Sequence, residues 1–232
     1  MKILSFNVKN FMHSRQMEQI SALLREMDAD IVGLQEVDEN TARSGKVFQL
    51  QTCAALAGYP YYVFGKNIDF KGGEYGNGIL SKYPILSAET VSYQVKEPGD
   101  HNRSYMRCQL DVNGKTLCFY NTHLTLQKNG EAVEELKEVC ARMEKDPNAV
   151  MVGDFNLPAE TVASVMEPRF KALNGGAGFE TVLTFPIGIP RVSIDNIVVS
   201  KNMETEGGIT TYLGELSDHN LIYAQVDFSQ ED

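Results

Sequence analysis

The strongest constraint on the fold is a recurring pattern in which a short apolar run ends directly on a polar side chain. The run Ala149–Val152 is followed by Gly153, Asp154, Phe155 and Asn156. The run is typical of a buried strand, and the residues after it are typical of an exit loop. Ligands of open α/β sheets bind beyond the carboxyl ends of the strands, so Asp154 is a candidate for chemistry. Taken alone, Asp and Asn at this place fit an ordinary turn better than a catalytic site.

Hydrophobic periodicity predicts a chain in which helices and strands alternate. Helices are predicted over residues 14–27, 44–57, 131–145 and 159–166, the third with Asn129 as its N-cap. Strands are predicted at residues 2–8, 31–34, 61–64, 78–81, 88–93, 105–112, 115–122, 149–152, 192–200 and 221–228. Asn113-Gly114 is predicted to form a two-residue hairpin turn that places Gln109 opposite Cys118. Both helix–strand alternation and hairpins occur, so the pattern predicts mixed sheets in one layered α/β domain over residues 1–232.

Composition narrows the class of partner and the compartment. A net charge of −10 argues against a protein that holds nucleic acid mainly by neutralising phosphates, although Lys66, Lys71, Arg103 and Lys128 leave room for a modest basic patch. The four cysteines have no zinc-like spacing, and reduced buried thiols are the simplest interpretation. Neither a signal peptide nor a membrane span of roughly 18 apolar residues is evident. We expect a cytoplasmic monomer.

The polar residues that end the apolar runs form a consistent set. They are Asn7, Glu36, Asn121, His123, Asp154 and Asn156, together with Asp195 and the turn Ser217-Asp218-His219. Each one alone is a weak signal, because Asn and Asp commonly end strands. Together they supply hard oxygen donors without a Cys–His cluster, which suits Mg²⁺ or Mn²⁺ better than zinc. A phosphate ester is the natural substrate of such a site.

Seven short motifs carry a resemblance to a known family. They are KILSFNV with Asn7, LQEV with Glu36, YGNGILS with Asn77, NTHL with His123, GDFN with Asp154 and Asn156, SIDNI with Asp195, and SDH with His219. In this order, and covering nearly the whole chain, they resemble the endonuclease/exonuclease/phosphatase superfamily with its deoxyribonuclease I-like fold. The resemblance implies a four-layer α/β/β/α sandwich of two mixed β-sheets with helices on the outer faces and the active site at one rim.

The resemblance also implies roles for the site residues. Glu36 would bind Mg²⁺, with Mn²⁺ as a substitute, assisted by Asn7 and Asp218. Asp154 would orient or deprotonate the attacking water, and Asn156 would donate to a phosphate oxygen. His219 would be held by Asp195, and His123 would contact the phosphate or protonate the leaving oxygen. Whether Asp154 or His219 takes the proton from water stays open.

Four further residues are second-tier candidates for substrate binding. Asn77 and Tyr75 lie in the third motif, although Gly-Asn-Gly equally fits a bend or bulge in a strand. Asn121 precedes His123 by two residues. Arg107 offers a guanidinium for a phosphate oxygen, yet an Arg on a strand more often lies on a solvated or salt-bridged face.

Three functions follow, in order of preference. The first is a metal-dependent phosphoesterase that hydrolyses a small phosphodiester or phosphomonoester, with a sugar-phosphate or a lipid head group as examples. The second is a DNA or RNA endonuclease or exonuclease of the same fold, which the acidic charge and the lack of Trp disfavour. The third is a catalytically silent binding module, which would be expected to have lost some of the residues that are all present here.

Overall fold

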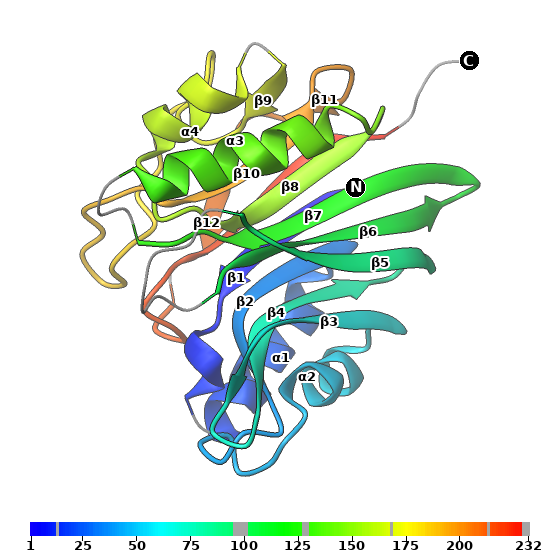
Figure 1. The fold of residues 1–232 in the computed structure, drawn as a ribbon, viewed down its shortest axis with the longest axis vertical. Helices are drawn as coiled ribbons and strands as arrows, with labels where there is room; N and C mark the ends of the chain where they lie inside the picture. Colours follow the sequence, from blue (N-terminus) through cyan, green and yellow to red (C-terminus); the bar gives the residue numbers. More distant parts are fainter. Residues whose placement is uncertain (13, 95–101, 127–129, 168, 213, 229–232) are drawn as a thin grey trace.

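Three groups of buried apolar residues divide the chain into four layers (Figure 1). One group, which includes Ile3, Ile79, Phe119 and Val152, lies between two β-sheets. The other two groups lie between each sheet and its own pair of helices. The computed structural model describes residues 1–12, 14–94, 102–126, 130–167, 169–212 and 214–228. The predicted α/β/β/α sandwich is confirmed.

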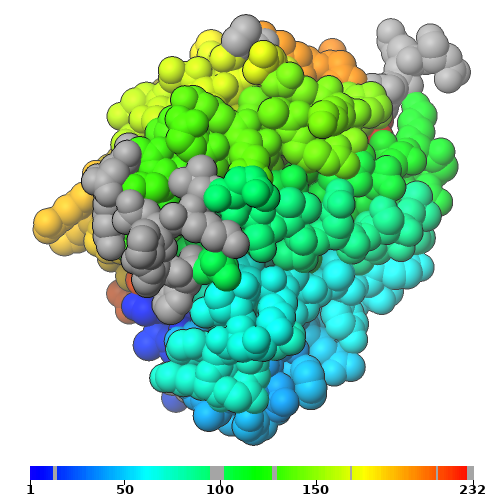
Figure 2. Space-filling model, viewed as in Figure 1, coloured from blue at the N-terminus to red at the C-terminus, as the bar shows by residue number. Residues whose placement is uncertain are grey.

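The first sheet joins the two ends of the chain. Its strand order is β11-β13-β1-β2-β4-β3, and β12 also pairs with β13. The bounds are β1 Lys2–Asn7, β2 Ile31–Glu39, β3 Tyr61–Phe70, β4 Gly73–Ser81, β11 Glu204–Thr205, β12 Thr210–Tyr212 and β13 Leu221–Asp227. The β1–β2 pair is parallel, whereas β13 runs antiparallel to β1. In the space-filling view the blue to cyan N-terminal part of the chain, which includes β1 to β4, fills the lower part of the molecule (Figure 2).

The second sheet is built by the middle of the chain. Its order is β5-β6-β7-β8-β10-β9. The bounds are β5 Ile85–Ser92, β6 Ser104–Val112, β7 Lys115–His123, β8 Ala149–Asp154, β9 Phe170–Ala172 and β10 Asp195–Ser200. Only β7 and β8 are parallel in this order, so the sheet is mixed as predicted. Gly33 of β2 lets the two sheets pack closely where β2 faces β8, because a Cβ on it would lie only 2.3 Å from the Val152 side chain.

The helices lie on the outer faces of the sheets. Their bounds are α1 Ser14–Met27, α2 Gln49–Ala57, α3 Glu131–Met143 and α4 Ala159–Met166, with a short 3₁₀ turn η1 over Lys9–Phe11. The predicted helix over 44–57 is too long. Gly45 and Lys46 have positive φ, and the Lys46 amide donates to the Thr41 carbonyl, so this part of the segment is a closed loop. Asn129, the predicted cap of α3, lies outside the described residues.

The predicted hairpin register between β6 and β7 is correct. Asn113 and Gly114 both have positive φ, as the favoured two-residue hairpin turns require. Gln109 pairs with Cys118, which keeps Cys108 away from it. All four cysteines are buried free thiols.

Glu39 at the end of β2 makes stability depend on pH. Its carboxylate accepts the Leu50 N–H at 2.8 Å at the start of α2, and burial raises its pKa to about 7. The native state therefore keeps a proton that the unfolded chain releases near the ordinary value of 4.5, so stability falls as pH rises between these values. Burial outweighs the benefit of a charge at the helix N-terminus, which is worth only about 0.3–1 kcal/mol.

Glu39→Gln is accordingly expected to stabilise the protein by about 1–2 kcal/mol at pH 8 and far less at pH 4.5. Urea unfolding of the variant and the wild type at both pH values measures this difference. Glu134→Gln, on the exposed face of α3, is the matched control for loss of a carboxylate. A variant that is less stable than the wild type at pH 8 would show that the helix-terminal charge outweighs burial.

Candidate active site

The carboxyl ends of two parallel strand pairs meet at one edge of the space between the sheets. Asn7 of β1 lies beside Gln35 of β2, and His123 of β7 lies beside Asp154 of β8. Alternate side chains of a strand point to the same face of its sheet. Asp154 lies two residues from Val152, which faces the space between the sheets, so Asp154 faces that space too. The same spacing within their own strands places Asn7, Gln35 and His123 on the inner face. The apolar part of each strand thus anchors a polar residue at its end.

A β-bulge brings Glu36 to the same side as Gln35. The β2–β4 register shifts between Leu34 and Val37, and Glu36 has a φ of 60°. Strict alternation would turn Glu36 toward the outer layer. Instead, the Asn7 side-chain amide donates to Glu36 Oε1 at 3.0 Å. Bulges commonly re-aim a side chain next to an active site, which is what this one achieves.

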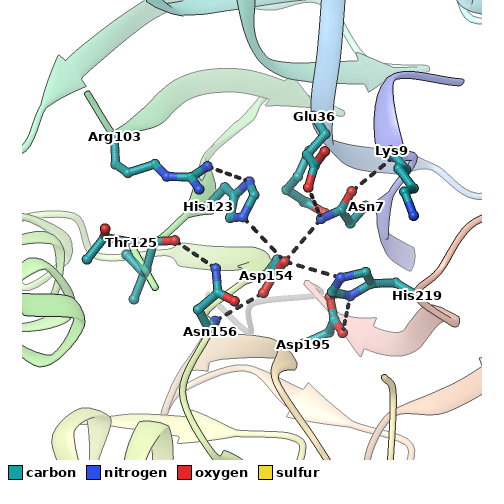
Figure 3. Close-up of polar contacts among 12 residues, drawn as sticks. Asn7, Lys9, Glu36, Arg103, His123, Thr125, Asp154, Asn156, Asp195 and His219 are labelled. Carbon is teal, nitrogen blue, oxygen red and sulfur yellow. Dashed lines mark hydrogen bonds and ion pairs between the residues drawn. The ribbon is translucent and has the colours of Figure 1, made fainter. Parts of the chain in front are cut away.

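Asp154 is the common partner of the site (Figure 3). Its Oδ2 accepts the Asn7 amide at 3.0 Å and lies 3.4 Å from His123 Nε2 and 3.5 Å from His219 Nε2. Its Oδ1 accepts the backbone N–H of Asn156 at 3.0 Å. The residue is almost fully buried. This geometry fixes the carboxylate between two imidazoles, and burial raises its pKa to about 7, against the lowering effect of His219.

His219 is oriented by Asp195. Its Nδ1 lies 3.0 Å from Asp195 Oδ2 and 3.2 Å from Oδ1, and the Phe185 ring packs 4.7 Å from the imidazole. The Asn174 amide and the Thr184 hydroxyl hold the backbone of Asp195. Burial alone would lower the pKa of His219, but Asp195, with Asp154 and Asp218, raises it to about 10. A carboxylate that binds one imidazole nitrogen directs the other nitrogen toward its target, which here is Asp154.

Arg103 determines which ring nitrogen of His123 carries the proton. Its Nη1 lies 2.9 Å from His123 Nδ1. An arginine only donates, so this nitrogen accepts and His123 carries its proton on Nε2, facing Asp154. Burial, together with the positive charges of Arg103 and His219, holds the pKa of His123 well below its ordinary value. His123 is therefore a neutral donor.

The donor set fits a hard divalent cation. Asp154, Asp195 and His219 place one ligand-type atom each within 4.8 Å of one another, and Glu36 joins them through the Asn7 amide. Three carboxylates thus share a small, largely buried region. Asn7 donates its Nδ2 to two of them, and its Oδ1 accepts the Lys9 N–H at 3.0 Å. In this arrangement Asn7 orients the carboxylates of Glu36 and Asp154.

The remaining predicted metal ligand, Asp218, lies beside β1 and is paired with a lysine. Its Oδ2 is 2.8 Å from Lys9 Nζ. The Ser217 hydroxyl donates to the Asn7 carbonyl at 2.6 Å, which fixes the Ser-Asp-His turn against β1. Asp218 thus lies at the rim of the site. Lys9 connects it to Asn7, which in turn binds Glu36.

Two predicted substrate-binding residues lie apart from this cluster. Arg107 is on the outer face of β6, where its guanidinium binds Asp146 with two contacts of 2.8 Å beyond the end of α3. Asn121 is inside the sandwich, and its Nδ2 donates to the carbonyls of Leu34 and Gly78 while its Oδ1 accepts from Gln35. The polar atoms of both residues are engaged in these structural contacts, so the geometry gives no support to the prediction that they bind substrate.

The other two second-tier residues lie next to Glu36. Asn77 stands opposite the bulge, is buried, and neither of its amide atoms has a hydrogen-bond partner among the described residues. Burial raises the pKa of Tyr75 above its ordinary value, and the charge of Glu36 adds to this effect while Arg103 opposes it.

Asn156 uses its side-chain Nδ2 to donate to the Leu124 carbonyl at 2.9 Å. An amide carries two N–H hydrogens, so this contact leaves one for a ligand.

Sequence reasoning missed two cations of the site. From the sequence, Arg103 is only a member of a possible basic patch, since nothing in its loop sequence relates it to His123. Lys9 follows Asn7 by two residues, and that proximity was the one available signal. Of the rest of the patch, Lys66 pairs with Asp69 and Glu74, and Lys128 lies outside the described residues.

Comparison with known proteins decides the family. Residues 4–219 match the profile of the Endonuclease/Exonuclease/phosphatase family. The chain belongs to this family. The Escherichia coli K12 protein YbhP is 25% identical over 251 aligned positions, which cover 97% of this chain and 95% of YbhP.

Two solved structures have the same fold as this chain. The mannosyl-6-phosphatase Bt3783 of Bacteroides thetaiotaomicron superposes with a TM-score of 0.75 at 17% identity, covering 98% of this chain and all of that one. Danio rerio TDP2, in complex with a single-strand DNA product, gives a TM-score of 0.76 at 19% identity, covering 98% of each chain. The superfamily comprises phosphoester hydrolases and nucleases. None of the helices in the described part of this chain has both the length and the hydropathy of a membrane span.

Proposed function

We propose that this protein is a metal-dependent phosphoesterase that hydrolyses a small phosphodiester or phosphomonoester, such as a sugar-phosphate or a lipid head group, by attack of water. The observation that carries the proposal is the position of Asp154, whose Oδ2 faces both His219 and His123 while Asn7 ties it to Glu36. A carboxylate held in this way is suited to orient a water and accept its proton.

The side chains divide the work of phosphoester hydrolysis. Asp154 orients the water, and the dyad of His219 and Asp195 stabilises the charge that develops beside it. His123 donates from Nε2 to a phosphate or leaving-group oxygen, because Arg103 keeps its Nδ1 as an acceptor. Asn156 and Asn77 offer amide hydrogens to non-bridging oxygens.

Mg²⁺ is the cation that we propose for the site, with Mn²⁺ as a substitute. Glu36 and Asp218 would hold it with oxygen donors, and Asn7 would position Glu36. When bound, such a cation withdraws charge from a phosphoryl oxygen and lowers the barrier to attack. The small number of protein carboxylates suits Mg²⁺, which usually keeps several of its waters.

A nuclease is the second candidate, because TDP2 was solved with a single-strand DNA product. Against it stand the net charge of −10 and the pairing of Lys66 with Asp69 and Glu74. Binding of a long polyanion relies on several free Lys and Arg side chains along a groove. A small substrate fits this charge distribution better.

The proposal is tested by hydrolysis of an aryl phosphodiester and the matching monoester with Mg²⁺, with Mn²⁺, and with chelator. Single- and double-stranded DNA oligonucleotides are assayed in parallel. Metal-dependent turnover of an aryl ester that exceeds turnover of DNA supports the proposal. Turnover of DNA alone supports the nuclease, and binding without turnover of any ester supports a silent module.

Glu36→Gln is expected to abolish most of the stabilisation that Mg²⁺ gives the wild-type protein. A ligand at 100 times its Kd stabilises the native state by about 2.7 kcal/mol, and a chain of this size gains roughly 2–4 °C in Tm per kcal/mol. Thermal unfolding with and without Mg²⁺ measures the difference, with Glu134→Gln as the control for charge. An unchanged Mg²⁺-dependent rise in Tm for Glu36→Gln would rule out Glu36 as a ligand.

A further inference from the structure

Four consecutive residues, from Lys9 to Met12, have a backbone with positive φ, and ψ is 28° at Asn10 and −50° at Met12. Lys9, Asn10, Phe11 and Met12 have φ values of 45°, 51°, 50° and 36°, and none of them is glycine. Such a conformation costs about 1–2 kcal/mol for each L-residue. The turn persists because Phe11 is fully buried and the Gln49 amide donates to the Asn10 carbonyl at 2.8 Å.

This turn holds Lys9 against the carboxylates of the site. Its backbone N–H donates to Asn7 Oδ1 at 3.0 Å, and its Nζ lies 2.8 Å from Asp218 Oδ2 (Figure 3). Lys9 therefore holds its positive charge beside Asp218, one of the two carboxylates proposed to hold Mg²⁺.

The ion pair itself does not account for the strained turn. The side chains of Lys9 and Asp218 are 44% and 33% exposed, and pairs with this exposure contribute only about 0–1 kcal/mol. Several residues with positive φ cost more than that. Strain of this kind at a functional site indicates a role in the chemistry, and the weakness of the pair means that Lys9 can leave Asp218 readily.

We propose that Lys9 is an exchangeable cation: it neutralises Asp218 until the divalent cation binds, and then binds a non-bridging oxygen of the substrate phosphate. The inference rests on the proposed function. The backbone of Lys9 is held by Asn7 Oδ1 and its side chain is partly exposed, so an ammonium released from Asp218 would stay at the rim of the site. Arg103 occupies the other side of Asp154, so Lys9 and Arg103 would approach the phosphate from opposite sides (Figure 3).

The proposal requires opposite effects on two ligands. In Lys9→Met, the Kd for Mn²⁺ or Mg²⁺, measured by calorimetry without substrate, is expected to fall about threefold to tenfold because a competing positive charge is gone. The Kd for inorganic phosphate, measured with the cation saturating, is expected to rise about tenfold because a charge-assisted hydrogen bond is lost. Lys9→Arg, the matched control, keeps the charge and should change either Kd by less than about twofold.

A second comparison isolates the exchange. In an Asp218→Asn background, Lys9→Met should tighten cation binding by a smaller factor than in the wild type, since the ion pair that competes with the cation is already broken. A Lys9→Met protein whose affinity for the cation is unchanged or weaker, or whose affinity for phosphate is unchanged, overturns the inference. If the wild type binds cation and hydrolyses esters in that case, only this inference fails. If the wild type neither binds a cation nor turns over any ester, the proposed function fails with it.

Discussion

Asp154→Asn is expected to lower kcat for phosphoester hydrolysis by about 10²- to 10⁴-fold, the contribution typical of general acid–base catalysis. The amide keeps the shape of the side chain and removes the charge that accepts a proton. It also mismatches its surroundings. If its oxygen faces Asn7, its NH₂ faces the Asn156 N–H, and the reverse orientation places it against the Asn7 amide.

A measurement of stability distinguishes a loss of catalysis in Asp154→Asn from a loss of folded protein. Either orientation of the new amide leaves one buried N–H donor without its acceptor, which costs about 1–3 kcal/mol. We expect urea unfolding to show a loss of stability of this size, with Asp154→Asn still folded at low urea while its kcat falls. Glu134→Gln should change neither quantity. A loss of less than about tenfold in kcat would contradict the role proposed for Asp154.

The sequence predicted the part of the site that depends on strand ends. The apolar runs of β1, β7 and β8 are continuous, so the residue after each run could be placed at a sheet edge without knowledge of the topology. Asn7, His123 and Asp154 do lie there together. The family motifs added Asp195 and His219, which come from β10 and the turn before β13 and could not be related by periodicity.

Features that break periodicity were beyond reach from the sequence. The bulge that turns Glu36 inward follows from a register shift between β2 and β4, and pairing partners are not encoded in one strand alone. The side of a strand on which a polar residue lies decides its role, as Arg107 illustrates. The loop over residues 44–48 has a helical apolar pattern, but Gly45 and Lys46 adopt positive φ, so tertiary contacts override propensity there.

Arg107→Ala is expected to destabilise the protein by about 3 kcal/mol and to leave kcat/KM of the folded enzyme within a few fold of the wild type. Arg107 and Asp146 have side chains only 10% and 8% exposed. Burial would raise the pKa of Asp146, but Arg107 and the Tyr120 hydroxyl lower it to about 2. Removal of the guanidinium leaves a buried carboxylate with Tyr120 and the more distant Arg142, at 3.4 Å.

The pH dependence provides an independent check on this pair. Because the folded pKa of Asp146 is lowered, its contribution to stability is present above the unfolded value of 3.8 and is lost as pH falls toward about 2. In Arg107→Ala this acid-dependent loss should shrink, and Arg107→Lys should fall between the two proteins because a lysine cannot reproduce the two-contact geometry. Unfolding by urea at pH 7 and pH 3 measures both effects. The opposite result, an unchanged stability with a large loss of kcat/KM, would support the prediction that Arg107 binds substrate. The substrate phosphate would then have to contact the outer face of β6.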